Sequence, residues 1–499
     1  MSFEAKALWL RGLGPKSSLV KAWFRGFSLA PFVGKDPVAA VLAFVLCLVL
    51  VVATWSHGAF FQPQASIFLG VSLVLVAVVI SRFGVTVLRR EDVSLFALSI
   101  WWLISAELHH EPRSFLPLGA SLTGILAGSL VTGEFGVEAR RTVTACVVAI
   151  GSLTALVGLI ACDLRWFPLA MRGQNVWRLA GSLTYSNAAG LLIAIALVLC
   201  LASNWRHSWR IASLELCSAG LVATESRGAL LAMTLAAAIF LRANVRQALV
   251  PLVMGLCAGI VTIAGARGHS PSFGALTGSC LILVAGYVWS RRRASTPPPG
   301  STNRTRRIGI AIGIAIAVAA TGFLARPELE RRLSSGSALA RLSEWRLALQ
   351  QFRTSPWLGV GPDKVLIPRT GGVASYLAHN EYLQILAGAG LVGATLLLST
   401  LILAGHRLWH HPRDSNGPLS AVLIFALGGA FDYTWHVPAL GLCAGIALGL
   451  ATNPKELNAA SAGGSSGPPV IAVSASPPGR SADSRAPSKV TLKSETPST

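Results

Sequence analysis

The sequence predicts an all-α protein, a polytopic membrane helix bundle of about 12–14 transmembrane helices with one long, partly helical outer loop. Two observations support this class. The chain is 53% hydrophobic and 13% charged, whereas a soluble protein carries about 25% charged residues. Long apolar runs also recur from residue 38 to residue 452, so the bilayer supplies the apolar environment that a soluble core would otherwise supply.

A spanning helix needs roughly 17–25 mostly apolar residues, and fourteen stretches approach this length. Several of them are short, so twelve or thirteen spans with some re-entrant segments is an open alternative. The stretches are 38–55, 64–81, 92–106, 115–132, 142–162, 187–203, 209–225, 228–241, 248–266, 273–290, 308–325, 381–405, 418–433 and 436–452.

Lys and Arg are distributed unevenly among the connections. They crowd the N-terminal segment and every second connection after it, whereas the connections in between carry few. By the positive-inside rule the rich side is cytoplasmic, so both termini are cytoplasmic and residues 326–380 lie outside. The formal net charge of +21 therefore reflects topology and contact with anionic membrane lipids, and nucleic acid is not expected as a partner.

These assignments divide the chain into five segments. The first apolar run begins near Val38, too far from the N-terminus for an ordinary signal peptide, so it is expected to be a retained span. The last segment is rich in Ser, Pro, Ala and Gly, which predicts disorder. The segments are a basic cytoplasmic N-terminal segment (1–36), a transmembrane bundle with a cytoplasmic linker at 291–307 (37–325), the periplasmic or outer loop (326–380), the C-terminal transmembrane helices (381–452) and a cytoplasmic tail (453–499).

The outer loop contains one stretch with helical periodicity. It predicts an amphipathic helix from about Ser337 to Arg353 that lies against the bundle or at the membrane interface. Pro356 and the glycine-rich run 359–362 end this helix. Arg341 falls away from the centre of its apolar stripe, as does Arg346. The stripe consists of Leu339, Leu342, Trp345, Leu349 and Phe352.

Arginines on the outer side are candidate phosphate ligands, because the planar guanidinium binds phosphate oxygens in pairs. Arg227 lies at an outer junction between two apolar spans, where a charge is costly and often functional. The alternative is an arginine that snorkels to headgroups or pairs with Glu225. For Arg341 and Arg346 the alternative is a solvated helix face. Arg178 precedes another span and would add a cation to the same face.

His379 directly precedes Asn380 and the last long span. A helix N-terminus attracts anions and disfavours an imidazolium, so a neutral histidine there suits a general base beside a bound phosphate. The alternative is a histidine that only caps the helix. Position alone does not select His379, since further histidines are expected on the outer side. These are His109, His110, His269 and His436.

The last outer turn carries Asp432 and His436 among aromatic residues. An aromatic belt with a polar turn is the simpler interpretation, and a secondary role in the site is the other. The outer carboxylates form no close pair that could cage a metal, and the chain has no HExxH or CxxC motif and no Walker-type loop. The sequence therefore predicts no metal and no nucleotide cofactor. Arginine is left as the means of neutralising a phosphate leaving group.

Several short motifs follow one another in a fixed order. The most specific is Arg341-Leu-Ser-Glu-Trp345, followed by Ser355-Pro-Trp-Leu-Gly-Val-Gly361. By these motifs and their spacing, residues 178–450 resemble the O-antigen ligase and polymerase superfamily, which includes O-antigen ligases, O-antigen polymerases and some protein O-oligosaccharyltransferases. The other matching motifs are Ser226-Arg-Gly-Ala229, His379-Asn-Glu-Tyr-Leu-Gln384 with Gly388 and Gly390, and Asp432-Tyr-Thr-Trp-His-Val-Pro438.

The resemblance implies an inverting glycosyltransferase of the bacterial inner membrane with its active site facing the periplasm. Its donor would be a glycan on undecaprenyl diphosphate. Its acceptor would be a hydroxyl of lipid A–core, as in lipopolysaccharide assembly, or of another glycan, and no metal, ATP or other cofactor is implied. The site residues so implied are His379 as the catalytic histidine, Arg227 and Arg341 on the diphosphate, Arg346 and Arg178 as further binding residues, and Asp432 and His436 as secondary candidates.

The motifs do not separate a ligase, which is the first expectation, from an O-antigen or exopolysaccharide polymerase. A transporter or flippase of lipid-linked sugars is the alternative from another class, since it too would have many spans and buried arginines. The histidine at the outer helix end weighs against this class. So does the lack of paired interrupted helices in two matching halves.

Overall fold

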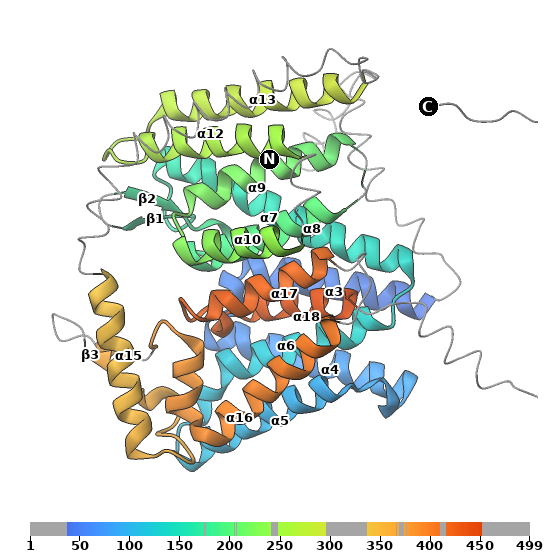
Figure 1. Cartoon of the computed structure of the whole chain (residues 1–499), viewed down its shortest axis with the longest axis vertical. Helices are drawn as coiled ribbons and strands as arrows, with labels where there is room; N and C mark the ends of the chain where they lie inside the picture. The colour runs from blue at the N-terminus through green and yellow to red at the C-terminus, as the bar shows by residue number, and fades with distance from the viewer. Residues whose placement is uncertain are drawn as a thin grey trace, which may run out of the picture. The chain divides into compact units, whose positions relative to one another are not determined.

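The structure is a computed structural model that describes residues 37–173, 176–203, 205, 207–240, 248–295, 337–365, 367–368, 374–375, 377–409 and 416–451. The predicted all-α membrane bundle is confirmed, with fourteen α-helices in these residues (Figure 1). They are α3 (Pro37–Trp55), α4 (Gln62–Phe83), α5 (Arg90–Leu108), α6 (Leu116–Gly133), α7 (Val137–Leu164), α8 (Ser186–Ala202), α9 (His207–Ala223), α10 (Arg227–Phe240), α12 (Leu249–Gly265), α13 (Phe273–Ser295), α15 (Ser337–Thr354), α16 (Glu381–Trp409), α17 (Asn416–Gly429) and α18 (Pro438–Leu450).

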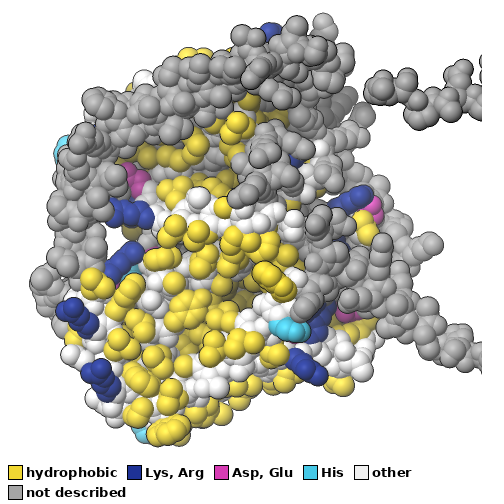
Figure 2. All heavy atoms as spheres, viewed as in Figure 1, with side chains coloured by type: hydrophobic (Ala, Val, Ile, Leu, Met, Phe, Trp, Pro, Cys, Tyr) yellow, Lys and Arg dark blue, Asp and Glu magenta, His cyan; other side chains and the backbone are white. Residues whose placement is uncertain are grey.

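Six helices are long and apolar enough to cross a membrane, and five shorter ones are also apolar, all counted within the described ranges. Their outward faces carry exposed large hydrophobic side chains, such as Ile67 on α4, Leu281 on α13 and Leu398 on α16. Figure 2 shows one such face, which is largely hydrophobic. Extended apolar surface of this kind requires an apolar surrounding, which fits a multi-pass membrane protein. The predicted span 308–325, the N-terminal segment and the tail lie outside the described residues.

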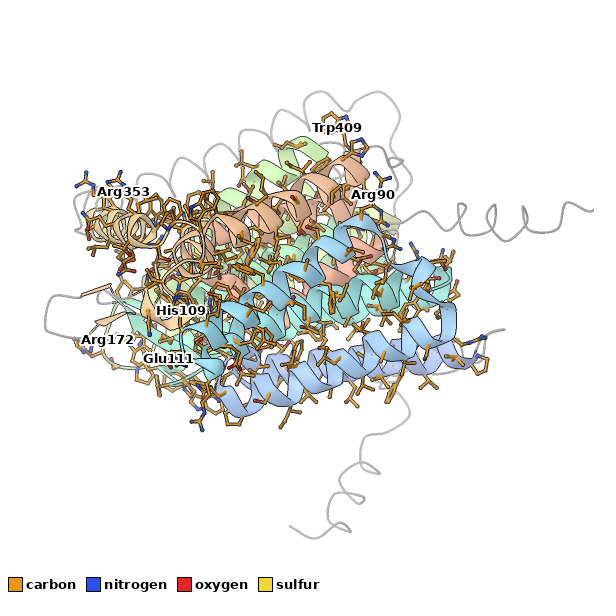
Figure 3. The ribbon with its side chains drawn as sticks, turned by 90° about the horizontal axis from the view of Figure 1, so that it is seen from below. Arg90, His109, Glu111, Arg172, Arg353 and Trp409 are labelled. Atoms are coloured by element: carbon orange, nitrogen blue, oxygen red, sulfur yellow. The ribbon has the colours of Figure 1, made fainter. Side chains whose placement is uncertain are left out.

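The connections between helices gather at two opposite ends of the bundle. Figure 3 places His109, Glu111, Arg172 and Arg353 at one end, and Arg90 and Trp409 at the other. We call the first the α15 end, because α15 lies there. The connection between α7 and α8 at this end holds an antiparallel hairpin, β1 (Ala170–Gly173) and β2 (Val176–Leu179), in which Met171 pairs with Arg178. How the two ends are oriented across the membrane stays a prediction.

Close packing of α6 against α18 sets the position of the turn that precedes α18. Gly124 and Gly128 of α6 face the backbone of α18, and a Cβ on Gly128 would lie 2.7 Å from the amide nitrogen of Ile446. Gly441 and Gly445 of α18 face the backbone of α6 in the same way. Small residues four apart allow two membrane helices to approach closely, and the turn 430–437 is held at the end of this pair.

The long helix α16 is interrupted at Gly390, which has a φ of 65°. The predicted span at 381–405 lies within this helix, and the sequence did not indicate the interruption. The freed backbone groups bind segment 355–361, since the amides of Val360 and Gly361 donate to the carbonyls of residues 387 and 388 at 2.8 and 3.1 Å. The motif Ser355–Gly361 therefore docks the outer loop into the break.

The bounds of α15 agree with the predicted helix to one residue at its end, but its contact face differs from the predicted stripe. Leu342 and Leu349 are 47% and 38% exposed, whereas Glu344 and Ala348 are buried. Ala348 packs in a small cluster with Val365, Ala378 and Ala387. Phe352 of the predicted stripe packs against this cluster and Trp345 is half-buried, so the contact face of α15 combines part of the stripe with Glu344 and Ala348.

Candidate active site

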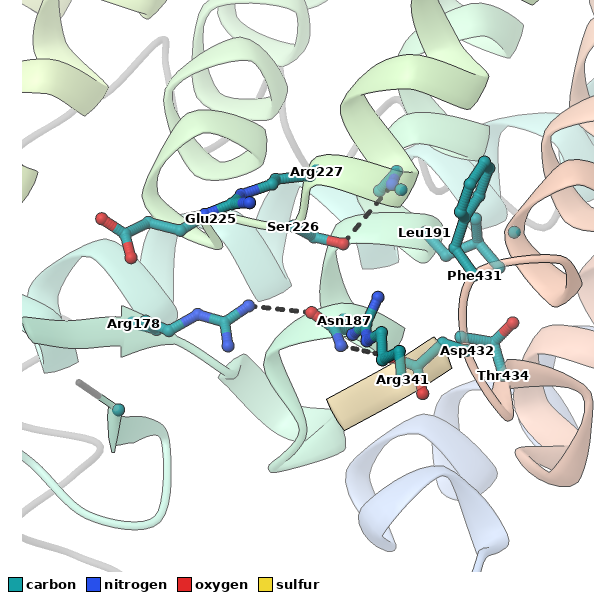
Figure 4. A pocket seen from close by; sticks show the side chains of 14 residues that line it. Arg178, Asn187, Leu191, Glu225, Ser226, Arg227, Arg341, Phe431, Asp432 and Thr434 are labelled. Atoms are coloured by element: carbon teal, nitrogen blue, oxygen red, sulfur yellow. Dashed lines mark hydrogen bonds between the residues drawn. The ribbon is translucent and has the colours of Figure 1, made fainter. Parts of the chain in front are cut away.

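A pocket of about 300 Å³ opens at the α15 end, between α10, β2, the start of α8, the 428–434 turn and α15. Three of its fourteen lining residues are arginines and two are carboxylates. The lining residues are Gly173, Arg178, Asn187, Leu191, Glu225, Ser226, Arg227, Gly228, Ala229, Arg341, Gly428, Phe431, Asp432 and Thr434. Figure 4 shows Arg178, Asn187, Arg341 and Asp432 along one side, with Ser226 and Arg227 across from them. We call this the arginine pocket.

The first turn of α10 forms one wall of the arginine pocket. Ser226 caps the helix, with its hydroxyl oxygen accepting the Ala229 N–H at 3.4 Å. Glu225 adopts a φ of 51°, which turns the chain sharply into the helix. Gly228 lies against Phe431, where a Cβ would come within 3.0 Å of the phenylalanine Cβ. The unsatisfied N–H groups of a helix start attract anions, so this wall is suited to phosphate.

The three arginines of the pocket differ in how they are held. Arg178 donates from Nε to the Thr224 carbonyl at 3.0 Å and from Nη2 to Asn187 Oδ1 at 2.8 Å, which fixes its guanidinium. Arg227 and Arg341 make no hydrogen bond or ion pair with any residue that the structure describes. Cations that line a cavity without a protein partner are the groups that an anionic ligand would pair with.

Asp432 is a fixed part of the pocket wall. Its Oδ2 accepts the Tyr185 hydroxyl at 2.7 Å and the Asn187 amide, and its Oδ1 accepts the Tyr433 N–H at 2.8 Å. Burial, and then the charge of Asp432, raise the pKa of the Tyr185 phenol well above its usual value. Tyr185 therefore remains a donor, and the chain of bonds from Arg178 through Asn187 to Asp432 keeps this wall rigid.

His379 lies beside the arginine pocket rather than in its lining. Its Nδ1 is 2.9 Å from Glu344 Oε2, and both side chains are at most 15% exposed. Its ring meets Tyr433 edge-on at 5.1 Å between centroids, and Tyr433 adjoins Asp432 in the pocket wall. A carboxylate on Nδ1 fixes the tautomer of a histidine, so that Nε2 is the nitrogen able to accept a proton.

Glu344 is a candidate site residue that the sequence argument did not select. A signal was present, because Glu344 follows Arg341 by three residues on a helix and so shares its face. The nearby Asn380 caps α16, accepting the Leu383 N–H at 3.1 Å, and donates to the Ala430 carbonyl at 3.0 Å. Asn380 thereby ties His379 to the turn that carries Asp432.

The structure separates the remaining candidates from the pocket. His436 is buried, with Nδ1 2.9 Å from Glu381 Oε2 and its ring against Trp102. Glu381 also accepts the Trp435 N–H at 2.7 Å, so this pair clamps the turn to α16. Arg346 is exposed on α15 and does not line the pocket. Within the described part of the chain, no three His, Cys, Asp or Glu side chains form a group that could hold a metal ion.

Fold and pocket together define a multi-pass membrane protein with an arginine-lined pocket at one end of its bundle. Residues 269–398 match the protein-family model described as O-Antigen ligase, and this match confirms the resemblance to the superfamily. The match includes Arg341, Glu344 and His379. No curated protein matches the chain. The family assignment points to a ligase-like or polymerase-like glycosyltransferase.

Proposed function

We propose that the protein is an O-antigen ligase-like glycosyltransferase. It moves a glycan from undecaprenyl diphosphate to an acceptor hydroxyl, on lipid A–core or a similar glycan, at the periplasmic face of the inner membrane. The observation that carries the proposal is the arginine pocket, in which Arg227 and Arg341 have no partner among the described residues beside the start of α10.

The arginine pocket supplies the charge that a diphosphate requires. Arg227 and Arg341 pair with its oxygens through their planar forks, and Arg178 adds a third cation in a fixed position. N–H groups at the start of α10 add donors. Negative charge grows on the diphosphate as it leaves, so preorganised cations stabilise the transition state more than the bound donor.

His379 is the general base of the proposed reaction. With Nδ1 held by Glu344, Nε2 takes the proton of the acceptor hydroxyl. The hydroxyl oxygen forms a bond to the anomeric carbon while the bond from that carbon to the phosphate oxygen breaks. The electron pair leaves with the diphosphate, and a single displacement inverts the carbon. The donor bond supplies the free energy, so the reaction needs no ATP, and in this proposal arginines rather than a metal ion neutralise the leaving diphosphate.

A polymerase of the same superfamily is the second candidate, and the family match supports it equally. Its acceptor would be the end of another lipid-linked glycan. The interruption of α16 bears on the transporter alternative, since interrupted helices form binding sites in transporters. Here the amides of residues 360 and 361 fill the break, which favours a structural role for it.

Purified protein in liposomes with a lipid-linked donor and separate acceptors tests the proposal. A covalent product on a lipid A–core acceptor supports a ligase, and growth of the donor glycan supports a polymerase. Relocation of the donor across the bilayer without any product would overturn the transferase assignment. Stereochemistry of the new bond, read by NMR, tests inversion.

A further inference from the structure

A second pocket, of about 170 Å³, lies at the α15 end next to the arginine pocket. Four aromatic side chains line it, namely Phe60, Phe61, Tyr185 and Tyr433, together with the polar side chains of His57 and Thr184. We call it the aromatic pocket. Nothing in the reaction proposed above uses it. At roughly 30 Å³ per water molecule, its volume is that of a few waters, which is the scale of one sugar ring rather than of a lipid chain.

We propose that the aromatic pocket is a binding subsite for a single pyranose unit of the glycan substrates. The proposal rests on the transferase function proposed above, which it extends by naming where a sugar is held. Its basis is the juxtaposition of an aromatic wall and a fixed polar pair beside the candidate base.

The aromatic wall has the geometry of a rigid platform. Tyr185 and Tyr433 stack at 5.0 Å between centroids with an angle of 14°, and Phe60 is tilted against Tyr433 at 6.4 Å. Phe61 stands edge-on to Phe60 and is 52% exposed, so it is at the mouth of the pocket. Aromatic rings offer large apolar faces at low entropic cost, and the C–H face of a pyranose packs on such faces.

The polar pair faces the same space. His57 Nδ1 and Thr184 Oγ1 are 3.0 Å apart and join the α3–α4 connection to the approach of α8. His57 has a φ of 56° and Thr184 a φ of 54°. Such a conformation is costly for residues other than glycine and persists where the surroundings impose it. A pocket with apolar walls and a few placed polar groups is the usual form of a small-molecule site.

The charge of the lining argues for a neutral ligand. Among the described residues, no Asp, Glu, Lys or Arg lines the aromatic pocket, whereas three arginines line its neighbour. A diphosphate is thus directed to one pocket and an uncharged sugar ring to the other.

The aromatic pocket lies next to the residues that we assign to the reaction. Tyr433 contacts the candidate base His379 with its ring and belongs to the aromatic pocket as well. Tyr185 binds Asp432, which lines the arginine pocket. A sugar held on these rings would therefore lie next to both the base and the diphosphate site. It can belong to the acceptor or to the donor, because both carry pyranose rings.

Phe61→Ala tests the subsite, because Phe61 is exposed at its mouth and touches neither His379 nor the arginines in any described contact. KM for donor and acceptor is measured separately in reconstituted protein. We expect a rise of about three- to tenfold in one of the two KM values with kcat retained. Phe61→Tyr, which keeps the ring, should restore the wild-type value. Phe273→Ala is the matched control, since Phe273 is 68% exposed on α13 and outside the pocket.

The two KM measurements, one for the donor and one for the acceptor, identify the substrate whose sugar occupies the pocket. A rise in the acceptor KM places the acceptor sugar in the pocket, and a rise in the donor KM places the donor sugar there. Unchanged KM values for both would overturn the subsite while leaving the transferase intact. If the wild type transfers no glycan, saturation-transfer NMR with free oligosaccharide still decides. Binding that weakens in Phe61→Ala supports the subsite without the reaction, and binding equal in both proteins overturns it.

Discussion

Arginine side chains lie at both ends of the bundle, and Arg227 and Arg341 at the α15 end are held differently from Arg140 and Arg407 at the other end. At the end that carries Arg90, Arg140 donates to three backbone carbonyls, those of residues 133, 135 and 450, at 2.8 to 3.2 Å. Arg407 forms an ion pair with Glu91 there. At the α15 end, Arg227 and Arg341 have no such partners among the described residues.

This difference separates two uses of a charge close to membrane depth. A paired guanidinium donates hydrogen bonds to carbonyls at helix ends and connects helices. The free-energy cost of placing its charge near membrane depth is therefore offset by contacts within the protein. Arg227 is exposed and Arg341 is half-buried, so their guanidinium groups can remain solvated and stay available to an anionic ligand. Both kinds look alike in the sequence, where each is an arginine at the end of an apolar span. The partners of each arginine, and not its position along the chain, therefore indicate which guanidinium groups are available to a substrate.

The largest effect should come from His379→Ala, at the end we assign to chemistry. Loss of a general base lowers the rate by about 10²- to 10⁴-fold. Insertion should remain, whereas thermal stability should fall modestly because buried Glu344 loses its partner, so the rate is compared per amount of folded protein. Transfer of glycan by the reconstituted variant measures it. His269→Ala is the matched control, because His269 is an exposed histidine beside Arg172, which Figure 3 shows at the same end. Wild-type activity in His379→Ala would refute the assignment of the base.

Arg140→Gln should lower folding stability and leave the rate of transfer unchanged. Buried carbonyls without a donor cost about 1–3 kcal/mol each, and up to three would lose their partner, so a total loss of about 3 kcal/mol is expected. The midpoint of thermal unfolding in detergent should fall, with normal KM values in the protein that remains folded. A variant of normal stability that fails to bind donor would remove the contrast between the two ends.

Arg341→Lys should lower activity and leave stability unchanged. Lysine keeps the charge but loses the bidentate fork, so about a tenfold rise in the donor KM is expected. The wild-type melting midpoint should persist, because Arg341 contributes no described hydrogen bond to the fold. If the donor KM also stays at its wild-type value, Arg341 supplies only bulk charge.

The family motifs alone already indicated much of this arrangement. Arg178, Arg227, Arg341 and Asp432 were selected from the sequence, and the structure brings all four to one pocket. The helical class and most helix bounds also followed from hydropathy, because a membrane span is encoded locally by length and apolar composition. Helix class and helix bounds depend on residues that are close together in the sequence.

Features that depend on contacts between distant segments could not be predicted from the sequence. The burial of Glu344 requires His379, which lies 35 residues further on, and the interruption of α16 requires the docked segment 355–361. His436, a possible secondary residue, is paired with Glu381 and does not line the arginine pocket. The spacing of residues along the sequence predicts which of them share a helix face. It does not predict which other element that face contacts.

The smallest effect should come from Arg346→Gln, which completes the comparison. The resemblance proposed Arg346 as a further binding residue, but the structure leaves its side chain exposed on α15 and away from the arginine pocket. An exposed cation with no partner among the residues that the structure describes contributes within about ±0.5 kcal/mol to stability, and we expect less than about a twofold change in the donor KM, which corresponds to ~0.4 kcal/mol. The assay is the one used for Arg341→Lys, so the two residues of one helix are compared directly. A loss as large as that of Arg341→Lys would mean that the donor reaches beyond the arginine pocket along α15.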